Sequence, residues 1–202
     1  MARPRAFDEA VVLSAARDEF RSHGYAATSV DSLAAATGLN RSSLYGSFGD
    51  KHRLFLRALD GYCEATLHDV REVLRERGVS ARQRLINHVH AIVNGIVADT
   101  DRRGCMMSRS SAELAGADPD VSGIVERSLE AWRRELADCI AEAQLEGAVA
   151  GDGSPQALAT VMLSLMQGFE ALGKGGVGSA ELRAAESAAL ALLFGAGTDP
   201  KP

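Results

Sequence analysis

Apolar residues recur along the chain at helical spacing, and glycines or short polar runs separate the apolar stretches. Near the start, Val12, Ala16 and Phe20 fall on every fourth position, and Gly24 follows them. Side chains three or four positions apart share one face of a helix, and glycine just after such a run favours its termination. No alternating pattern typical of strands and no repeat of fixed period is present. The chain is therefore predicted to be all-α.

The positions of the breaks divide this pattern into nine expected helices. Breaks are expected at Gly78, at Gly104 and at the runs AGADP, GAVAGDGSP and GKGGVGS. We expect a domain boundary near Asp50, with residues 1–50 forming one domain and residues 51–202 the other. The expected helices cover residues 8–23, 30–37, 41–48, 51–77, 81–98, 105–115, 119–146, 155–174 and 180–194.

The third expected helix has too few apolar residues to build a core. Leu44 and Phe48 make one apolar edge, while its other positions are polar or aromatic. Two short helices joined by a tight turn at Gly38 form the helix-turn-helix pattern, which places its second helix in the major groove of DNA. Arginine, serine and tyrosine side chains bind base edges and phosphates. The alternative is a helical hairpin that only packs. The candidate DNA contacts on this helix are Arg41, Ser42, Ser43, Tyr45 and Ser47.

Two further features of this region suit a phosphate backbone. Lys51 stands in the first turn of the fourth expected helix, where an ammonium group and the helix dipole can bind one phosphate together. Arg3 and Arg5 flank Pro4, and an extended basic arm of this kind can enter the minor groove. The alternative for the arm is a tail with incidental charge.

The distribution of charge along the chain agrees with DNA binding better than the net charge of the whole chain does. The whole chain carries a net charge of −5, which alone argues against nucleic acid. Residues 1–57 hold eight basic and six acidic residues, whereas the remainder holds 14 basic and 21 acidic residues. A basic N-terminal region followed by an acidic body lets the first part face phosphate.

The run GYAATSVDSLAAATGLNRSSLYGSFGDKHRLFLRAL, residues 24–59, resembles the DNA-binding region of the TetR family of transcriptional repressors. The matching features are the glycine–aromatic pair, the Thr-Ser cap, the turn at Gly38, the LYGSF helix and the DK…LF start of the next helix. The resemblance implies a nine-helix fold in which the first three helices bind DNA and the others bind ligand and dimerise. It also implies that Thr28 joins the candidate DNA contacts.

The last two expected helices are strongly apolar. They either fill the core of a single chain or, as the resemblance implies, form a four-helix interface between two subunits. A dimer also suits recognition of an inverted repeat, because one short helix makes few contacts with DNA. The candidate interface residues are Leu158, Leu165, Phe169, Leu172, Leu182 and Leu193.

Cys105 is the most suggestive residue for a sensor. It begins an expected helix directly after Arg102, Arg103 and Gly104, and both a helix N-terminus and nearby arginines favour the reactive thiolate. The GC…AEL sequence resembles a TetR subgroup that includes an N-ethylmaleimide-responsive repressor, and this resemblance implies that Lys174 pairs with Cys105. The alternative is a packed cysteine without redox use.

A reversible small-molecule ligand is the rival trigger. Its candidate pocket residues are Trp132, Met162, Met166 and Phe169, although such a stripe is more often core. His88 and His90 stand two apart, which places them on nearly opposite helix faces. The sequence indicates no metal site and no cofactor.

Other classes of protein fit the sequence less well. Three widely spaced cysteines do not suggest a disulfide framework, and no apolar run is long enough to span a membrane. With no signal peptide recognisable, we expect a cytoplasmic protein. The expected function is a homodimeric transcriptional repressor, not an enzyme, that leaves an inverted-repeat operator upon ligand binding or thiol modification. The alternatives are a helical ligand-binding protein with a degenerate DNA-binding region, or a thiol enzyme that uses Cys105.

Overall fold

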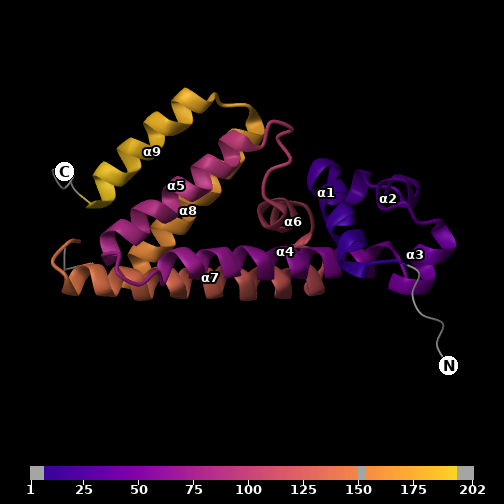
Figure 1. Ribbon diagram of the computed structural model, residues 1–202, viewed down its shortest axis with the longest axis horizontal. Helices are drawn as coiled ribbons and strands as arrows, with labels where there is room; N and C mark the ends of the chain where they lie inside the picture. Colours follow the sequence, from indigo (N-terminus) through magenta and orange to yellow (C-terminus); the bar gives the residue numbers. More distant parts are fainter. Residues whose placement is uncertain (1–6, 150–152, 195–202) are drawn as a thin grey trace. The chain divides into compact units, whose positions relative to one another are not determined.

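The computed structural model describes residues 7–149 and 153–194, and all regular structure in these residues is helical (Figure 1). The helices are α1 (Glu9–Ala27), α2 (Val30–Thr37), α3 (Arg41–Phe48), α4 (Lys51–Leu74), α5 (Ala81–Ala98), α6 (Met106–Leu114), α7 (Pro119–Leu145), α8 (Pro155–Gly175) and α9 (Ser179–Phe194). Nine helices without strands in the described residues confirm the predicted all-α fold class.

The chain divides into two compact units, which are described separately. The first contains residues 1–65 and 103–126, and the second contains residues 66–102 and 127–202. The division falls inside α4 and inside α7, so each of these helices contributes its first part to one unit and its remainder to the other. The stretch 103–126, which includes α6, thus belongs to the same unit as α1 to α3.

In the first unit, α1 and α4 supply the core. Val12, Ala16 and Phe20 on α1 are buried, as their fourfold spacing predicts. The ring of Phe20 meets that of Phe55 edge to face, with centroids 5.0 Å apart, a favourable arrangement of aromatic pairs. Leu44 joins this core from α3. Figure 1 shows α6 beside α1, and the two helices are in contact.

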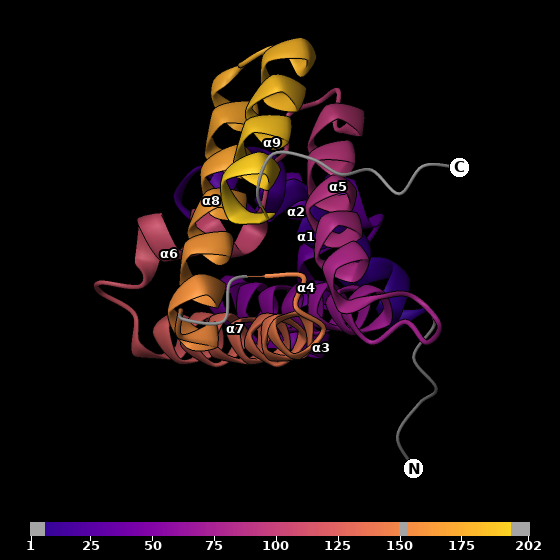
Figure 2. The same ribbon diagram turned by 90° about the vertical axis from the view of Figure 1, so that its left-hand side faces the viewer.

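In the second unit, α5, α8 and α9 pack side by side, as both views show (Figures 1 and 2). Leu85 and Val93 from α5 and Met162 and Met166 from α8 are almost fully buried. Gly173 lets α8 approach α5 closely, because an added Cβ would lie 2.2 Å from the Ile96 side chain. The apolar stripe of α8 therefore supplies a large part of this unit's own core.

Most helix ends lie within one residue of the expected position, and the ends of α1 and α4 differ by more. The helical assignment of α1 continues past Gly24 to Ala27, although Gly24 itself, at φ 83° and ψ 173°, breaks the helix. α4 ends at Leu74, three residues early, before a turn at Gly78. Cys105 is the N-cap of α6 and not its first residue. In the described residues, no helix is both long and apolar enough to cross a membrane.

Candidate nucleic-acid interface

Local capping sets the geometry of the α2–α3 pair. Ser29 caps α2 by accepting a hydrogen bond from the Ser32 amide, and the Ser32 hydroxyl accepts one from the Ser29 amide in return. Gly38 ends α2 in the left-handed conformation at φ 69°. Asn40 then caps α3 by accepting from the Ser43 amide at 2.8 Å. With every end capped, two helices of eight residues each are joined by a tight turn.

α3 presents a polar face to solvent, as the sequence predicts. Leu44 and Phe48 are buried, whereas Arg41, Ser42, Tyr45 and Gly46 are exposed and Ser43 and Ser47 are half-buried. A Cβ added at Gly46 would meet no atom within 4 Å. This face offers a guanidinium group, hydroxyl groups and an exposed aromatic ring on a helix of the size that enters a major groove.

Arg41 has a partner within the chain. Its guanidinium group forms a two-point ion pair with Asp31 of α2, and both side chains are largely exposed. An exposed ion pair of this kind contributes little to stability. Arg41 can therefore exchange Asp31 for a base edge or a phosphate at small cost.

Lys51 and Thr28 are turned toward the chain itself. The Lys51 ammonium group donates to the carbonyl oxygens of Tyr25 and Thr28, each at 2.8 Å, and lies 4.2 Å from the centre of the Tyr25 ring. Thr28 is buried, and its hydroxyl donates to the Gly24 carbonyl at 2.6 Å. Both side chains thus hold the link between α1 and α2. Their contacts with DNA stay predictions, and Lys51 would have to give up carbonyl partners to make one.

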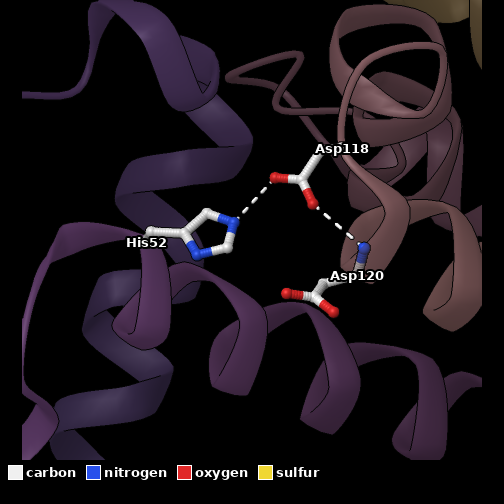
Figure 3. A group of neighbouring side chains, drawn as sticks. All are labelled: His52, Asp118 and Asp120. Atoms are coloured by element: carbon white, nitrogen blue, oxygen red, sulfur yellow. Dashed lines mark hydrogen bonds and ion pairs between the residues drawn. The ribbon is translucent and has the colours of Figure 1, made fainter.

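His52, Asp118 and Asp120 form a group whose geometry could accept a metal ion. They point toward one another from the starts of α4 and α7 (Figure 3), with their ligand atoms within 4.8 Å. However, Asp118 accepts from His52 at 2.7 Å with one carboxylate oxygen and caps α7 with the other. The positive end of α7 also disfavours a cation here. We therefore interpret the group as an ion pair and a helix cap.

The pKa of Asp118 reflects these contacts. Burial alone would raise it, but the His52 hydrogen bond and two backbone amides outweigh burial and hold the pKa below its usual range. The carboxylate form of Asp118 is thereby favoured. Neither His52 nor Asp118 was identified from the sequence, because a pair 66 positions apart leaves no local pattern.

The predicted sensor cysteine is buried at the start of α6. Cys105 is 8% exposed, and its side chain makes no capping hydrogen bond. The two arginines before it have other neighbours: Arg103 pairs with Asp18 at 3.5 Å, and the Arg102 guanidinium group lies against Gly176. Lys174 donates to the Arg102 carbonyl. The sensor role of Cys105 and its pairing with Lys174 therefore stay predictions.

The residues proposed for a reversible ligand are packed in the core of the second unit. Trp132, Met162, Met166 and Phe169 are each at most 5% exposed. The Trp132 indole donates to Nε2 of His88, which is 2.9 Å away. A cavity of about 250 Å³ in this unit lies elsewhere, between the ends of α5 and α8 and the start of α9, and none of these four residues lines it. Their role in ligand binding stays a prediction.

The residues proposed for a dimer interface divide into two sets. Leu165 and Leu172 are exposed on α8, and Leu158 and Leu193 are half-buried. Phe169 and Leu182 are buried within the chain itself, so their burial requires no second subunit. The exposure of Leu165 and Leu172 fits the predicted interface. The interface itself stays a prediction, because the structure contains a single chain. Arg3 and Arg5 lie outside the described residues.

Comparisons with known proteins agree with this geometry. The first part of the chain, residues 12–58, matches the family "Bacterial regulatory proteins, tetR family", and residues 81–176 match "Tetracyclin repressor-like, C-terminal domain". The transcriptional repressor ComR of Escherichia coli K12 is 28% identical over 169 residues, which cover 83% of this chain and 80% of ComR.

Two solved structures are similar along almost the whole chain. A cysteine mutant of the TetR family regulator CifR, solved with 26-base-pair double-strand operator DNA, is 30% identical, with a TM-score of 0.76 and coverage of 93% of this chain and 98% of CifR. The reduced form of NemR from E. coli has a TM-score of 0.82 at 17% identity over 95% of this chain and 98% of NemR, and this likeness shows the fold alone. Taken together with the two family matches, the likeness to CifR shows that the chain belongs to the TetR family of DNA-binding transcriptional regulators, which are not enzymes.

Proposed function

We propose that the protein is a homodimeric repressor that binds an inverted-repeat operator through two copies of α3. The observation that carries this proposal is the capped α2–α3 pair, with an exposed polar face on the second helix. Two such helices related by a twofold axis reach successive major grooves when the half-sites are about one helical turn apart. We also propose that the protein acts in the cytoplasm, the location that suits a regulator of this family.

Each exposed group on α3 has a role suited to its chemistry. Arg41 is the candidate for reading a base edge, since its planar fork matches guanine. The hydroxyl groups of Ser42 and Tyr45 bind phosphates or base edges, and Gly46 leaves room for the DNA backbone. We assign DNA binding to residues 1–50 and ligand binding and dimerisation to residues 51–202.

A gel-shift assay with DNA from upstream of the protein's own gene tests the proposal. The purified protein is expected to retard a fragment containing an inverted repeat at concentrations that leave a scrambled fragment free. Equal retardation of both fragments, or none, would contradict specific operator binding. It would instead favour a helical ligand-binding protein with a degenerate DNA-binding region.

The ion pair between α2 and α3 gives a matched pair of variants. Arg41→Ala is expected to weaken specific binding by roughly 10- to 100-fold and to relax the preference at one base position, because it removes a base contact. Asp31→Ala is expected to strengthen binding, because it frees Arg41 and removes a negative charge near the phosphates. Fluorescence anisotropy on operators mutated at single positions measures both effects. Weaker binding by Asp31→Ala would show that the ion pair orients Arg41 and does not compete with DNA.

We propose two alternative triggers for release from the operator: thiol modification at Cys105 and a reversible small-molecule ligand. Cys105 is the N-cap of α6, one helical turn before Arg109. Cys139, which is also buried, is poorly suited to react, because burial raises the pKa of its thiol to about 11. A thiol enzyme is the weaker alternative for Cys105, because regulators and not enzymes make up the family.

The thiol trigger predicts a specific product. A mild oxidant such as hydrogen peroxide converts the Cys105 thiol to a sulfenic acid, which condenses with the Lys174 amine to form a sulfur–nitrogen bond and water. The expected results are a mass loss of two hydrogens and release of the operator. Intact-mass measurement and a gel shift on the same sample detect both. Cys105→Ser is expected to bind DNA and ignore the oxidant, and Lys174→Ala to lose the product.

The thiol trigger fails if Cys105→Ser responds like the wild type, or if Cys105 is alkylated no faster than Cys63 and Cys139. The reversible ligand then becomes the remaining trigger.

A further inference from the structure

The end of α1, on both sides of Gly24, is held by two side chains of α6. At Gly24 the helical path of α1 breaks, with φ 83° and ψ 173°. A break of this kind deprives carbonyls before it and amides after it of their helical partners. These backbone groups need other partners, and two charged residues of α6 supply them.

Arg109 binds the carbonyl side of the break. Its guanidinium group donates to the carbonyl oxygens of Arg21 and Ser22, each at 3.2 Å, and of His23 at 2.9 Å. A planar group with several N–H donors is suited to three converging carbonyls, and its positive charge suits the negative end of a helix. Arg109 therefore acts as a C-cap supplied by another helix.

Glu113 binds the amide side of the same break. Its carboxylate accepts from the Tyr25 amide at 3.1 Å and from the Ala26 amide at 2.8 Å. Arg109 and Glu113 are four residues apart on α6, so they lie on one face of that helix, and their side chains are 3.9 Å apart. We call these two residues the α6 clamp.

The residue at the break suits the α6 clamp. A Cβ added at Gly24 would lie 2.7 Å from both the Arg109 side chain and the Glu113 carboxylate. Glycine is thus needed for the positive φ and for the close approach of α6. On the same segment, Lys51 holds two carbonyls and the Thr28 hydroxyl binds Gly24, so residues 24–28 are held both by α4 and by α6.

We propose that Arg109 and Glu113 are positioning residues for operator binding, which act on α3 through the segment 24–28 without touching DNA. This inference rests on the proposed function. The segment leads directly into Ser29, the cap of α2, so its conformation sets where the α2–α3 pair begins. Opening the α6 clamp releases this segment and reduces the fraction of molecules in which α3 is correctly placed to bind DNA.

The α6 clamp is built to open at modest cost. The two side chains are 34% and 27% exposed, so water can replace their hydrogen bonds when α6 moves. The Arg109 amide donates to the carbonyl of Cys105 at 3.2 Å, which places the clamp one helical turn after the N-cap of α6. A group attached at Cys105, or a ligand that shifts α6, would therefore act on the α6 clamp first.

Three variants distinguish a positioning role of the α6 clamp from a contribution to the general stability of the fold. Arg109→Met and Glu113→Ala each remove one half of the α6 clamp, and Glu113→Gln keeps an oxygen acceptor without the charge. Glu130→Gln is the matched control, because Glu130 makes its ion pairs with Arg133 and Arg134 within α7. Circular dichroism checks that each variant is folded. Hydrogen exchange at the Tyr25 and Ala26 amides and the salt dependence of operator affinity are then measured.

Arg109→Met and Glu113→Ala are expected to bind the operator about 10-fold more weakly, with faster exchange at the Tyr25 and Ala26 amides. The salt slope is expected to stay unchanged, because no phosphate contact is lost. Glu113→Gln is expected to fall between Glu113→Ala and the wild type, and Glu130→Gln to match the wild type.

Operator affinity within twofold of the wild type, despite faster exchange, would overturn the proposal. A salt slope reduced by about one would also overturn it, because Arg109 would then contact phosphate itself. If wild-type protein binds no operator, the proposed function fails, and slower exchange in the wild type than in Glu113→Ala still shows that the clamp holds the segment.

Discussion

Leu165→Asp is expected to convert the protein into a monomer that no longer binds its operator. Leu165 is an exposed apolar residue on α8, in line with the exposed Leu172 and Val161. In a dimer built on this face, the variant would bury two carboxylates, one from each subunit. Because burying an unpaired charge costs several kcal/mol, the dimer is expected to weaken by on the order of 100-fold or more. Sedimentation velocity measures the change.

Leu145→Asp is the matched control for this change. Leu145 is 90% exposed at the end of α7, outside the predicted interface. The control is expected to remain dimeric and to bind the operator. A wild-type protein that sediments as a monomer, or a Leu165→Asp variant that remains dimeric, would show that the interface lies elsewhere or does not exist.

Acidification is expected to destabilise the second unit through His88. Burial lowers the pKa of His88 to about 4 from its ordinary value of 6.5, and its Nε2 accepts the Trp132 hydrogen bond, which requires the neutral ring. The unfolded chain binds the proton more readily than the folded chain. The contribution of the neutral His88 ring to the free energy of unfolding is therefore fully present above pH 6.5 and is lost as the pH falls toward 4. Between pH 7.5 and pH 5 the loss is about 2 kcal/mol.

His88→Gln isolates this effect, because glutamine can accept the Trp132 hydrogen bond but does not titrate. The free energy of unfolding in urea is measured for both proteins at pH 7.5 and pH 5. The variant is expected to lose about 2 kcal/mol less than the wild type over this interval. An equal loss in both proteins would show that His88 does not stay neutral, or that other groups control the acid response.

Much of the fold could be predicted because its signals are local. The spacing of Val12, Ala16 and Phe20 identifies a buried face, and Gly38 and Asn40 end one helix and begin the next within three residues. The end of α1 was harder to place. Gly24 breaks the helix as predicted, but contacts from α6 hold the residues after it in a further turn.

The candidate site could be predicted only in part. The exposure of Ser42 and Tyr45 follows from the positions of Leu44 and Phe48 on a two-turn helix. The inward turn of Lys51 could not be predicted, because its carbonyl partners lie 23 and 26 positions away. The contacts of the α6 clamp span up to 88 positions, and no spacing rule connects residues so distant in sequence.

A hydroxyl-radical footprint of the wild-type dimer on its operator tests the central claim most directly. Two copies of α3 in successive major grooves predict two protected half-sites, inverted with respect to each other and centred roughly 10 base pairs apart. Arg41→Ala is expected to lose protection in both half-sites at the same protein concentration. Protection of a single half-site, or an identical footprint for Arg41→Ala at every concentration, would contradict DNA recognition by paired α3 helices.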